Sequence, residues 1–271
     1  MRTRGRVRVG AVNYLNTKPL IYDFARLAPK AKLILDLPSR LAEGLADGSL
    51  DVALVPSIEC FQDPSYTVVS DACIACRGPV LSVKLFSRVP AAEIVSLALD
   101  EGSRTSVALV RILLKERFGL EPRLEPLPVG HSIRETRADA VLLIGDRAIH
   151  PPAERFAEVW DLGDEWCRFA ELPFVFAMWT ARSGTDLQGV DGALRRSRDL
   201  GVQNLPAIAA AESAALGLTQ RECLTYLRDN LYFYLGPREL EGLALFHRLA
   251  AEMGLAPKGT ELDLSDCRAL G

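Results

Sequence analysis

The chain has 271 residues, of which 49% are hydrophobic and 25% are charged. This is an ordinary globular composition, with room for one large domain or two small ones. Its 32 basic and 35 acidic residues give a formal charge of −3, so there is no broad basic field to attract nucleic acid or a membrane surface. An anionic ligand must therefore be held by local hydrogen-bond donors.

The first part of the chain alternates between strands and helices. Strands are predicted at about residues 6–13, 32–37 and 50–55, with a helix over 17–27 and a second helix after Ser39. This order predicts a parallel sheet with right-handed crossovers. Pro19 suits a first helical turn, and Asn16 or Thr17 just before it is a suitable N-cap.

The middle of the chain repeats this alternation, and the end is helical. After about residue 183 only helices are predicted, including one that starts with a capping box at Thr219–Glu222 and one that opens at Pro237. Between these regions the predicted elements are strands at 67–69, 80–86, 95–99, 140–144 and 172–179, and a helix from Ser106 to Phe118 closed by Gly119.

This order of elements predicts an α/β protein of two lobes, the second inserted into the first. Lobe 1 comprises residues 1–87 and 180–271, and lobe 2 comprises residues 88–179. The strands near 80–86 and 172–179 are expected to carry the chain between the lobes. A cleft between two lobes is a common place for a small-molecule site.

Polar residues follow four of the predicted buried strands, at the carboxyl ends where open parallel sheets bind ligands. One such residue is commonly a helix cap. Four at equivalent places predict a site rich in neutral donors and helix N-termini, which suits carboxylates or phosphates. The four groups are Asn13 with Asn16, Pro56-Ser57, Ser103-Arg104-Thr105-Ser106, and Gly145-Asp146.

The segment Ser103–Ser106 is the clearest anion-binding candidate, because its hydroxyls and the first N–H groups of the next helix can converge on one carboxylate. The alternative is a capped helix with Arg104 in solvent. Ser82 is a polar residue in an apolar strand at a predicted lobe crossing. It is either part of the site or a core hydroxyl bonded to the backbone.

Metal ions, redox chemistry and organic cofactors are not expected. Cys73 and Cys76 form one Cys-x-x-Cys pair with no second pair at zinc spacing, so they are predicted to be buried thiols. The sequence has no glycine-rich phosphate loop. Residues 160–166 are predicted to form a loop anchored by two indoles rather than a metal site.

The ends of the chain bear on its location. The basic start is followed by a strand that polar residues interrupt, unlike the apolar core of a signal peptide. Apolar runs fall far short of the ~20 residues of a membrane span. A soluble, cytoplasmic protein is therefore expected, with a weakly structured tail from Leu255 to Gly271.

Three specific motifs occur in order along the chain: Tyr-Leu-Asn-x-x-Pro-Leu at residues 14–20, Ser-Arg-Thr-Ser at 103–106 and Leu-Pro-Phe-Val-Phe-Ala at 172–177. Further matching segments lie at 48–54, 82–87, 143–146 and 161–166. Together they resemble the chorismate dehydratases of the futalosine route to menaquinone. The chain departs from that pattern at Phe169-Ala170-Glu171, where the family usually has Thr-Gly.

The resemblance implies a type II periplasmic-binding-protein-like fold with a ligand cleft between the lobes. It also implies a hydro-lyase that converts chorismate to 3-[(1-carboxyvinyl)oxy]benzoate and water, without metal or organic cofactor. Candidate catalytic residues are Asn16, Ser82 and Asp146. Candidate substrate-binding residues are Tyr14, Ser57, Ser103, Thr105 and Ser106.

The sequence allows more than one base and more than one function. The general base is either Asp146 or the enolpyruvyl carboxylate of the substrate itself. A non-catalytic binding protein for small anions has the same fold, although it would normally be exported. A sister enzyme of the same pathway, of the 1,4-dihydroxy-6-naphthoate synthase type, is expected to lack the motif at residues 14–20. The chain is expected to be a monomer or a dimer.

Overall fold

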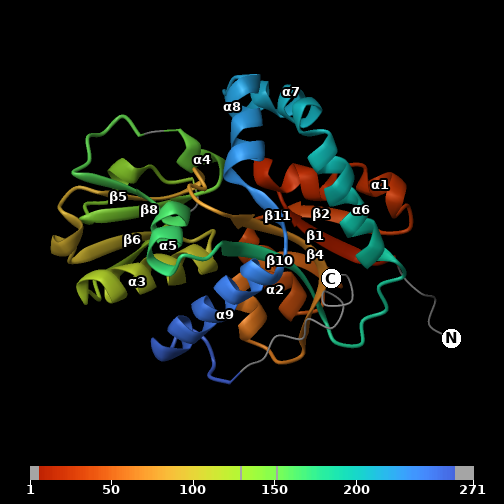
Figure 1. The fold of residues 1–271 in the computed structure, drawn as a ribbon, viewed down its shortest axis with the longest axis horizontal. Coiled ribbons are helices and arrows are strands. Elements are labelled where there is room, and N and C mark those ends of the chain that lie inside the picture. The colour runs from red at the N-terminus through yellow and green to blue at the C-terminus, as the bar shows by residue number, and fades with distance from the viewer. Residues whose placement is uncertain (1–5, 129, 151, 260–271) are drawn as a thin grey trace.

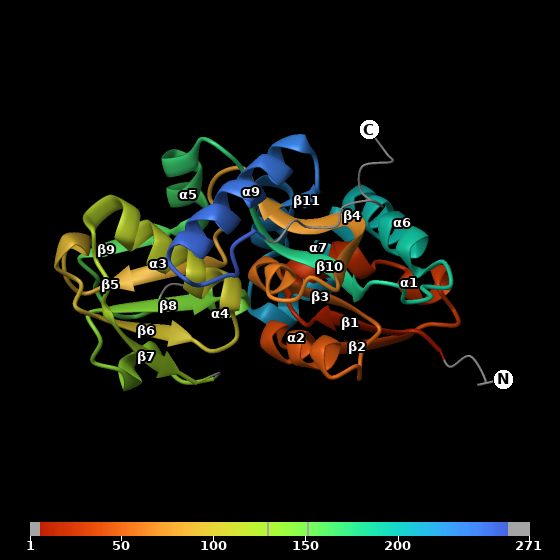
Figure 2. The same cartoon turned by 90° about the horizontal axis from the view of Figure 1, so that it is seen from below.

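The computed structural model describes residues 6–128, 130–150 and 152–259. They form two lobes, each built around one β-sheet (Figure 1), and the two sheets lie side by side in the view from below (Figure 2). Cys267 and the predicted tail beyond residue 259 lie outside the described residues. Within the described ranges, no helix is long and apolar enough to cross a membrane.

The larger lobe, the six-stranded lobe, confirms the predicted parallel core. β1 pairs in parallel with β2 and β3, and antiparallel strands extend the sheet beyond β3. The strands, in sheet order, are β11 (Tyr232–Tyr234), β4 (Tyr66–Cys76), β10 (Phe174–Arg182), β3 (Val52–Pro56), β1 (Arg8–Val12) and β2 (Lys32–Asp36). Its helices are η1 (Leu15–Ile21), α1 (Phe24–Leu27), α2 (Pro38–Ala46), η2 (Ser57–Phe61), α6 (Val190–Gln203), α7 (Leu205–Leu216), α8 (Gln220–Thr225), η5 (Tyr226–Asn230) and α9 (Pro237–Glu252).

The smaller lobe, the five-stranded lobe, contains the second alternating unit. β6 pairs in parallel with β7 and β8, while β5 joins β8 to β9 in antiparallel pairing. The strands, in sheet order, are β7 (Arg123–Leu127), β6 (Ser96–Asp100), β8 (Ala140–Ile144), β5 (Val83–Ser87) and β9 (Glu158–Asp161). Its helices are η3 (Ala91–Glu93), α3 (Arg104–Phe118), η4 (Ile133–Glu135), α4 (Asp146–Ile149) and α5 (Leu162–Ala170).

Two segments carry the chain between the lobes. Residues 77–82, the first crossing, connect β4 to β5, and residues 171–173, the second crossing, connect α5 to β10. β5 thus joins the five-stranded sheet and β10 the six-stranded sheet, which differs from the lobe limits expected at residues 87 and 180. Apolarity locates both strands but does not say which sheet each one joins, because an apolar strand fits either core.

The helix predicted over 17–27 is instead two short segments, the 3₁₀-helix η1 and α1. Asp23 between them has a φ of 58°, which breaks the helical path. η1 starts early, so its N-cap residue is Tyr14, and the N-cap role predicted for Asn16 or Thr17 is wrong. The short strand β11 likewise interrupts the region predicted to be entirely helical.

The prediction of a loop at residues 160–166 is also wrong, because β9 ends and α5 begins there. Asp161 is the N-cap of α5, and its carboxylate accepts the N–H of Gly163 at 3.0 Å. Trp166 is buried, and its indole N–H donates to the carbonyl of Pro173 at 3.1 Å. The acidic and aromatic residues of this stretch therefore build a helix start and anchor the second crossing.

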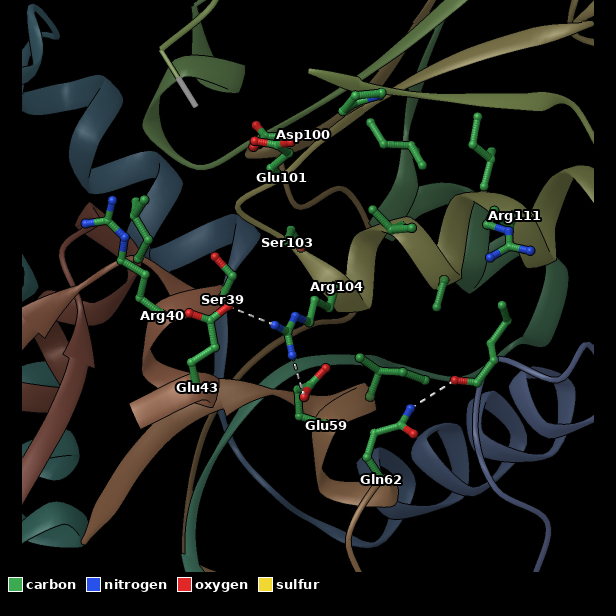
Figure 3. Close-up of a pocket in the computed structure, with 18 of the residues that line it drawn as sticks. Ser39, Arg40, Glu43, Glu59, Gln62, Asp100, Glu101, Ser103, Arg104 and Arg111 are labelled. Carbon is green, nitrogen blue, oxygen red and sulfur yellow. Dashed lines mark hydrogen bonds and ion pairs between the residues drawn. The ribbon is translucent and has the colours of Figure 1, made fainter. Parts of the chain in front are cut away.

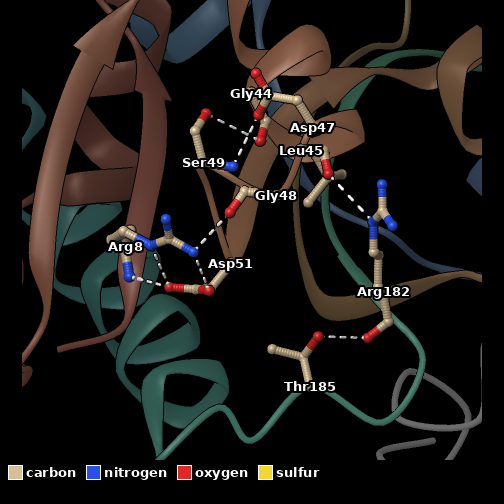
Figure 4. A network of polar contacts seen from close by, with 9 residues as sticks. All are labelled: Arg8, Gly44, Leu45, Asp47, Gly48, Ser49, Asp51, Arg182 and Thr185. Atoms are coloured by element: carbon tan, nitrogen blue, oxygen red, sulfur yellow. Dashed lines mark hydrogen bonds and ion pairs between the residues drawn. The ribbon is translucent and has the colours of Figure 1, made fainter. Parts of the chain in front are cut away.

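Two arginines donate hydrogen bonds to the end of α2 and to the turn that follows it (Figure 4). Arg8 donates to the two carboxylate oxygens of Asp51 at 2.9 and 2.7 Å and to the carbonyl of Gly48 at 2.8 Å. This pairing with Arg8 lowers the pKa of Asp51. Arg182 of β10 donates to the carbonyl of Leu45 at 3.3 Å. The network ties β1 and β10 to the end of α2 and to the turn before β3, and so stabilises the parallel core.

Candidate active site between the lobes

A narrow cavity of about 60 Å³ lies where the two lobes meet. Strand ends from both sheets reach it, including Val12 and Pro56 from one lobe and Ile144 from the other. Among the described residues of its wall, none has a charged side chain. The lining residues are Val12, Tyr14, Asn16, Pro38, Pro56, Ile74, Val80, Ser82, Val83, Ser103, Ser106, Ile144, Gly145, Phe176 and Ala177.

Five of the eight predicted site residues belong to this wall. Because they come from the start of η1, the first crossing and the start of α3, the fold brings together the separate strand ends expected from the sequence. The residues on the wall are Tyr14, Asn16, Ser82, Ser103 and Ser106, and those outside it are Ser57, Thr105 and Asp146.

Asn16 reaches the cavity because η1 starts one residue before it. The Leu15 N–H, which has no partner within the helix, donates to Oδ1 of Asp146 in the other lobe at 3.1 Å. This bond takes the place of a side-chain cap. The Asn16 side chain is therefore not used for capping, and its Oδ1 accepts the hydroxyl of Thr17 at 3.2 Å.

Ser82 ends the first crossing in an unusual turn. Leu81 has a φ of 60°, which is rare outside glycine, and the Ser82 N–H donates across it to the Val80 carbonyl at 2.7 Å, forming a γ-turn. The Asp161 carboxylate accepts the N–H groups of Val80 and Leu81 at 2.8 and 2.6 Å. Such strained backbone persists only where its surroundings hold it, and it is concentrated at functional sites.

One residue that adjoins this wall, Tyr226, was not predicted from the sequence. Its hydroxyl donates to Oγ of Ser82 at 2.9 Å, and the nearby Asn16 side chain acts to lower the pKa of the same phenol. Tyr226 is buried in η5, and burial raises its pKa well above the ordinary value. A tyrosine in a helical segment is usually interpreted as a core residue. Because 144 positions separate Tyr226 from Ser82, no local sequence pattern indicates that the two side chains meet.

α3 begins at the cavity with Ser103 as its N-cap. Oγ of Ser103 accepts the N–H of Ser106 at 3.2 Å and donates to Oγ of Ser106 at 2.8 Å. The first N–H groups of a helix lack intrahelical partners and carry the positive end of its dipole, so this corner favours an anion. The helix cap of the alternative interpretation is therefore present, and anion binding stays a prediction.

Ser57 and Thr105 connect the lobes. Oγ of Ser57 donates to the carbonyl of Val175 at 2.7 Å and lies 3.4 Å from Oγ1 of Thr105. The N–H of Ile58 donates to the same Thr105 oxygen at 3.2 Å. The structure thus places both residues in a contact between the lobes, and their binding of substrate stays a prediction.

Two titratable groups lie at the edge of the cavity. Burial raises the pKa of Asp146 above its usual 3.8, and the Leu15 N–H and Lys18 partly offset that effect. Burial, assisted by the negative charge of Asp100, raises the pKa of Tyr14 to about 12. Tyr14 therefore lines the cavity as a protonated phenol, able to donate a hydrogen bond.

A wider groove of about 980 Å³ adjoins the cavity, and Ser103 lines both (Figure 3). Five acidic and three basic side chains line the groove, which makes it less suitable for a dianion than the neutral cavity. Arg104 of α3 reaches across it, donating to Glu59 at 2.9 Å and to Glu43 at 3.2 Å. Arg104 therefore forms ion pairs between the lobes, in contrast to the predicted alternative in which it points into solvent.

The donors of the cavity are hydroxyls, an amide and backbone N–H groups, which bind carboxylates by hydrogen bonding. In the described part of the chain, no three His, Cys, Asp or Glu side chains are grouped so that they could hold a metal ion. Cys73 and Cys76 are buried thiols on β4, as predicted.

Comparison with known proteins gives a family as well as a fold. Residues 7–252 match a protein-family model described as menaquinone biosynthesis. A chorismate dehydratase from Thermus thermophilus is 34% identical over 256 residues, which cover 88% of this chain and 93% of that enzyme. The match therefore includes both lobes and both crossings.

Solved structures agree on the fold. A protein from Archaeoglobus fulgidus has a TM-score of 0.73 at 16% identity, covering 92% of this chain and 98% of its own. The periplasmic aliphatic sulphonate-binding protein of Escherichia coli has a TM-score of 0.63 at 17% identity, covering 97% and 92%. At these identities the likeness concerns the fold alone, and it confirms the expected periplasmic-binding-protein-like architecture.

Proposed function

The chain belongs to the menaquinone-biosynthesis family, and from this premise we propose that it is a lyase that dehydrates chorismate to 3-[(1-carboxyvinyl)oxy]benzoate. The observation that carries the proposal is the neutral cavity between the lobes, where Asn16 and Ser82 share a wall with the start of α3. Chorismate has two carboxylates, which suit hydroxyl, amide and helix N-terminal donors. We also propose a cytoplasmic location for this biosynthetic step.

The proposed reaction removes one hydrogen and one hydroxyl from neighbouring ring carbons. The hydrogen beside the enolpyruvyl ether leaves as a proton, and the electrons of its C–H bond join the ring. The neighbouring C–O bond breaks, and its oxygen takes up a proton and leaves as water. Because the product ring is aromatic, the substrate supplies the driving force, and the protein contributes mainly by positioning the ring and excluding water.

The residues of the cavity wall divide into two roles. Asn16 and Ser82, which lie together near Tyr226, donate hydrogen bonds to the departing hydroxyl or to the ring carboxylate. Ser103 and Ser106, with the first N–H groups of α3, hold a carboxylate. Each donor is held in place by neighbours before substrate arrives, which is the arrangement that favours a charged transition state.

The general base that removes the ring proton is a carboxylate of the substrate itself. The described residues of the cavity wall include no carboxylate, and Asp146 lies outside it with its Oδ1 bonded to the Leu15 N–H. The enolpyruvyl carboxylate is tethered beside the hydrogen that leaves, so it meets the geometric requirement for a base. Asp146 instead holds the start of η1, the segment that presents Asn16.

The direct test is to incubate purified, metal-free protein with chorismate and to follow products by mass spectrometry and ultraviolet absorbance. We expect a species lighter by one water that absorbs as a substituted benzoate. Asn16→Ala should lower kcat/KM by about 10²-fold, since removing a donor to developing charge has effects of that order. Asn13→Ala is the matched control, because Asn13 is exposed and is not a lining residue. Chorismate that stays intact with the wild-type protein would leave a binding function as the better explanation.

A further inference from the structure

We infer that Tyr226 is a positioning residue for the proposed dehydration: its hydroxyl holds the Ser82 hydroxyl so that Ser82 donates its own hydrogen into the cavity. The inference rests on the proposed function, because it assigns Ser82 a donor role in that reaction. Tyr226 itself is not a lining residue of the cavity, so it acts through Ser82.

The hydrogen bond between the two hydroxyls has a defined direction. The Tyr226 O–H donates to Oγ of Ser82 at 2.9 Å. A serine hydroxyl that accepts one bond keeps its single hydrogen for another acceptor. Since Ser82 lines the cavity, that acceptor is expected to be the substrate. Burial raises the pKa of the Tyr226 phenol well above its ordinary value, so the hydroxyl keeps the hydrogen that it donates across the ordinary pH range.

The helix that carries Tyr226 is built for a specific contact with the first crossing. η5 is a π-helix that follows α8 directly. π-helical turns are rare overall, and those that occur are often found at functional sites. At its other end, Nδ2 of Asn230 donates to the carbonyl of Pro79 at 2.9 Å. One helical turn therefore bonds to Ser82, the last residue of the γ-turn, and to Pro79, the residue just before that turn. In Figure 1, α8 and the segment after it run down between the two lobes.

Ser82 is thus fixed from two sides. Asp161 of the five-stranded lobe holds the strained backbone at Leu81, and the N–H of Gly145 donates to the Ser82 carbonyl at 2.8 Å. Tyr226 of the six-stranded lobe holds the side chain. Fixing both the backbone and the hydroxyl of one residue is what a preorganised donor requires, and it exceeds what packing alone would need.

Tyr226→Phe removes the hydroxyl and keeps the ring in the core. We expect kcat to fall about tenfold and KM to change less than about twofold, because the lost bond orients a donor that acts in the transition state. The melting temperature should stay close to that of the wild-type protein. Tyr66→Phe is the matched control, since Tyr66 is also buried but lies at the far end of β4 from the first crossing.

A double-mutant cycle with Ser82→Ala distinguishes positioning from a general structural role. If Tyr226 acts through Ser82, Tyr226→Phe should cause no further loss of kcat in the Ser82→Ala background. An equal loss in both backgrounds would overturn the inference, and so would a Tyr226→Phe variant with unchanged kcat.

Wild-type turnover of chorismate is measured first, so that the proposed function and the inference can fail separately. If the wild-type protein does not turn over chorismate, the proposed function is wrong, and crystal structures then decide the contact between Tyr226 and Ser82. The Ser82 Oγ is expected to leave its wild-type rotamer in Tyr226→Phe. An unchanged rotamer in that variant would overturn the positioning role.

Discussion

Asp146 carries a partly buried charge whose effect on stability can be measured. Burial raises its pKa above 3.8, so folding favours the protonated carboxyl. The cost of the charge is present above the folded pKa and disappears as pH falls below the unfolded value. Asp146→Asn keeps an acceptor for the Leu15 N–H without the charge. We expect it to melt at a higher temperature than the wild-type protein at pH 7, with the difference closing toward acidic pH, as followed by circular dichroism.

The same variant separates the two candidate bases. Loss of a general base lowers the rate by about 10²- to 10⁴-fold. Because Asp146 lies outside the cavity wall, we expect Asp146→Asn to keep kcat/KM within about threefold of the wild-type value, well short of that range. A loss of 100-fold or more would assign proton removal to Asp146 instead of the substrate carboxylate.

Elements with a strong local sequence pattern were predicted correctly, whereas features that depend on long-range contacts were not. β8 and the Gly119 end of α3 follow from apolar runs and a helix stop, and the structure confirms both. The early start of η1 depends on Asp146, which is 131 positions away from Leu15. The site shows the same division, because strand-end polar residues mark Asn16 and Ser103, whereas Tyr226 reaches Ser82 only through the packing of η5.

One element contact offers a sharp test, because α6 packs against η1 with no room for a methyl group. A Cβ on Gly201 would lie 2.1 Å from the carbonyl oxygen of Pro19. Gly201→Ala must therefore displace η1, which carries Asn16, or α6. We expect a loss of about 1–3 kcal/mol in the free energy of unfolding together with a lower kcat/KM, measured by urea titration and steady-state kinetics.

Gly192→Ala on the same helix is the control for that contact. A Cβ there has no atom within 4 Å, and alanine is the better helix former by about 0.8–1.0 kcal/mol. Gly192→Ala should therefore leave stability unchanged or slightly raised, with normal turnover. Equal effects of the two alanines would show that Gly201 does not set the approach of α6 to η1.

At the scale of the whole molecule, the two lobes are in contact around the cavity. The cavity of about 60 Å³ is much smaller than the ~300 Å³ at the lower end of ligand pockets. Contacts that bridge the lobes surround it, among them the Leu15–Asp146 and Ile58–Thr105 hydrogen bonds. Entry of a substrate therefore requires the lobes to separate, and their closure afterwards would exclude water from the ring.

Arg104 is placed to favour closure, because its guanidinium bonds to both Glu43 and Glu59 across the groove. Exposed ion pairs contribute about 0.2–1 kcal/mol each, so Arg104→Gln should raise KM about two- to tenfold by weakening closure of the lobes over the bound substrate. We expect kcat to change little and the wild-type KM to approach that of the variant at high salt. Arg111→Gln removes the same charge from the same groove wall and should leave KM unchanged. An equal rise in both variants would mean that the charge of the groove, rather than closure by Arg104, controls binding.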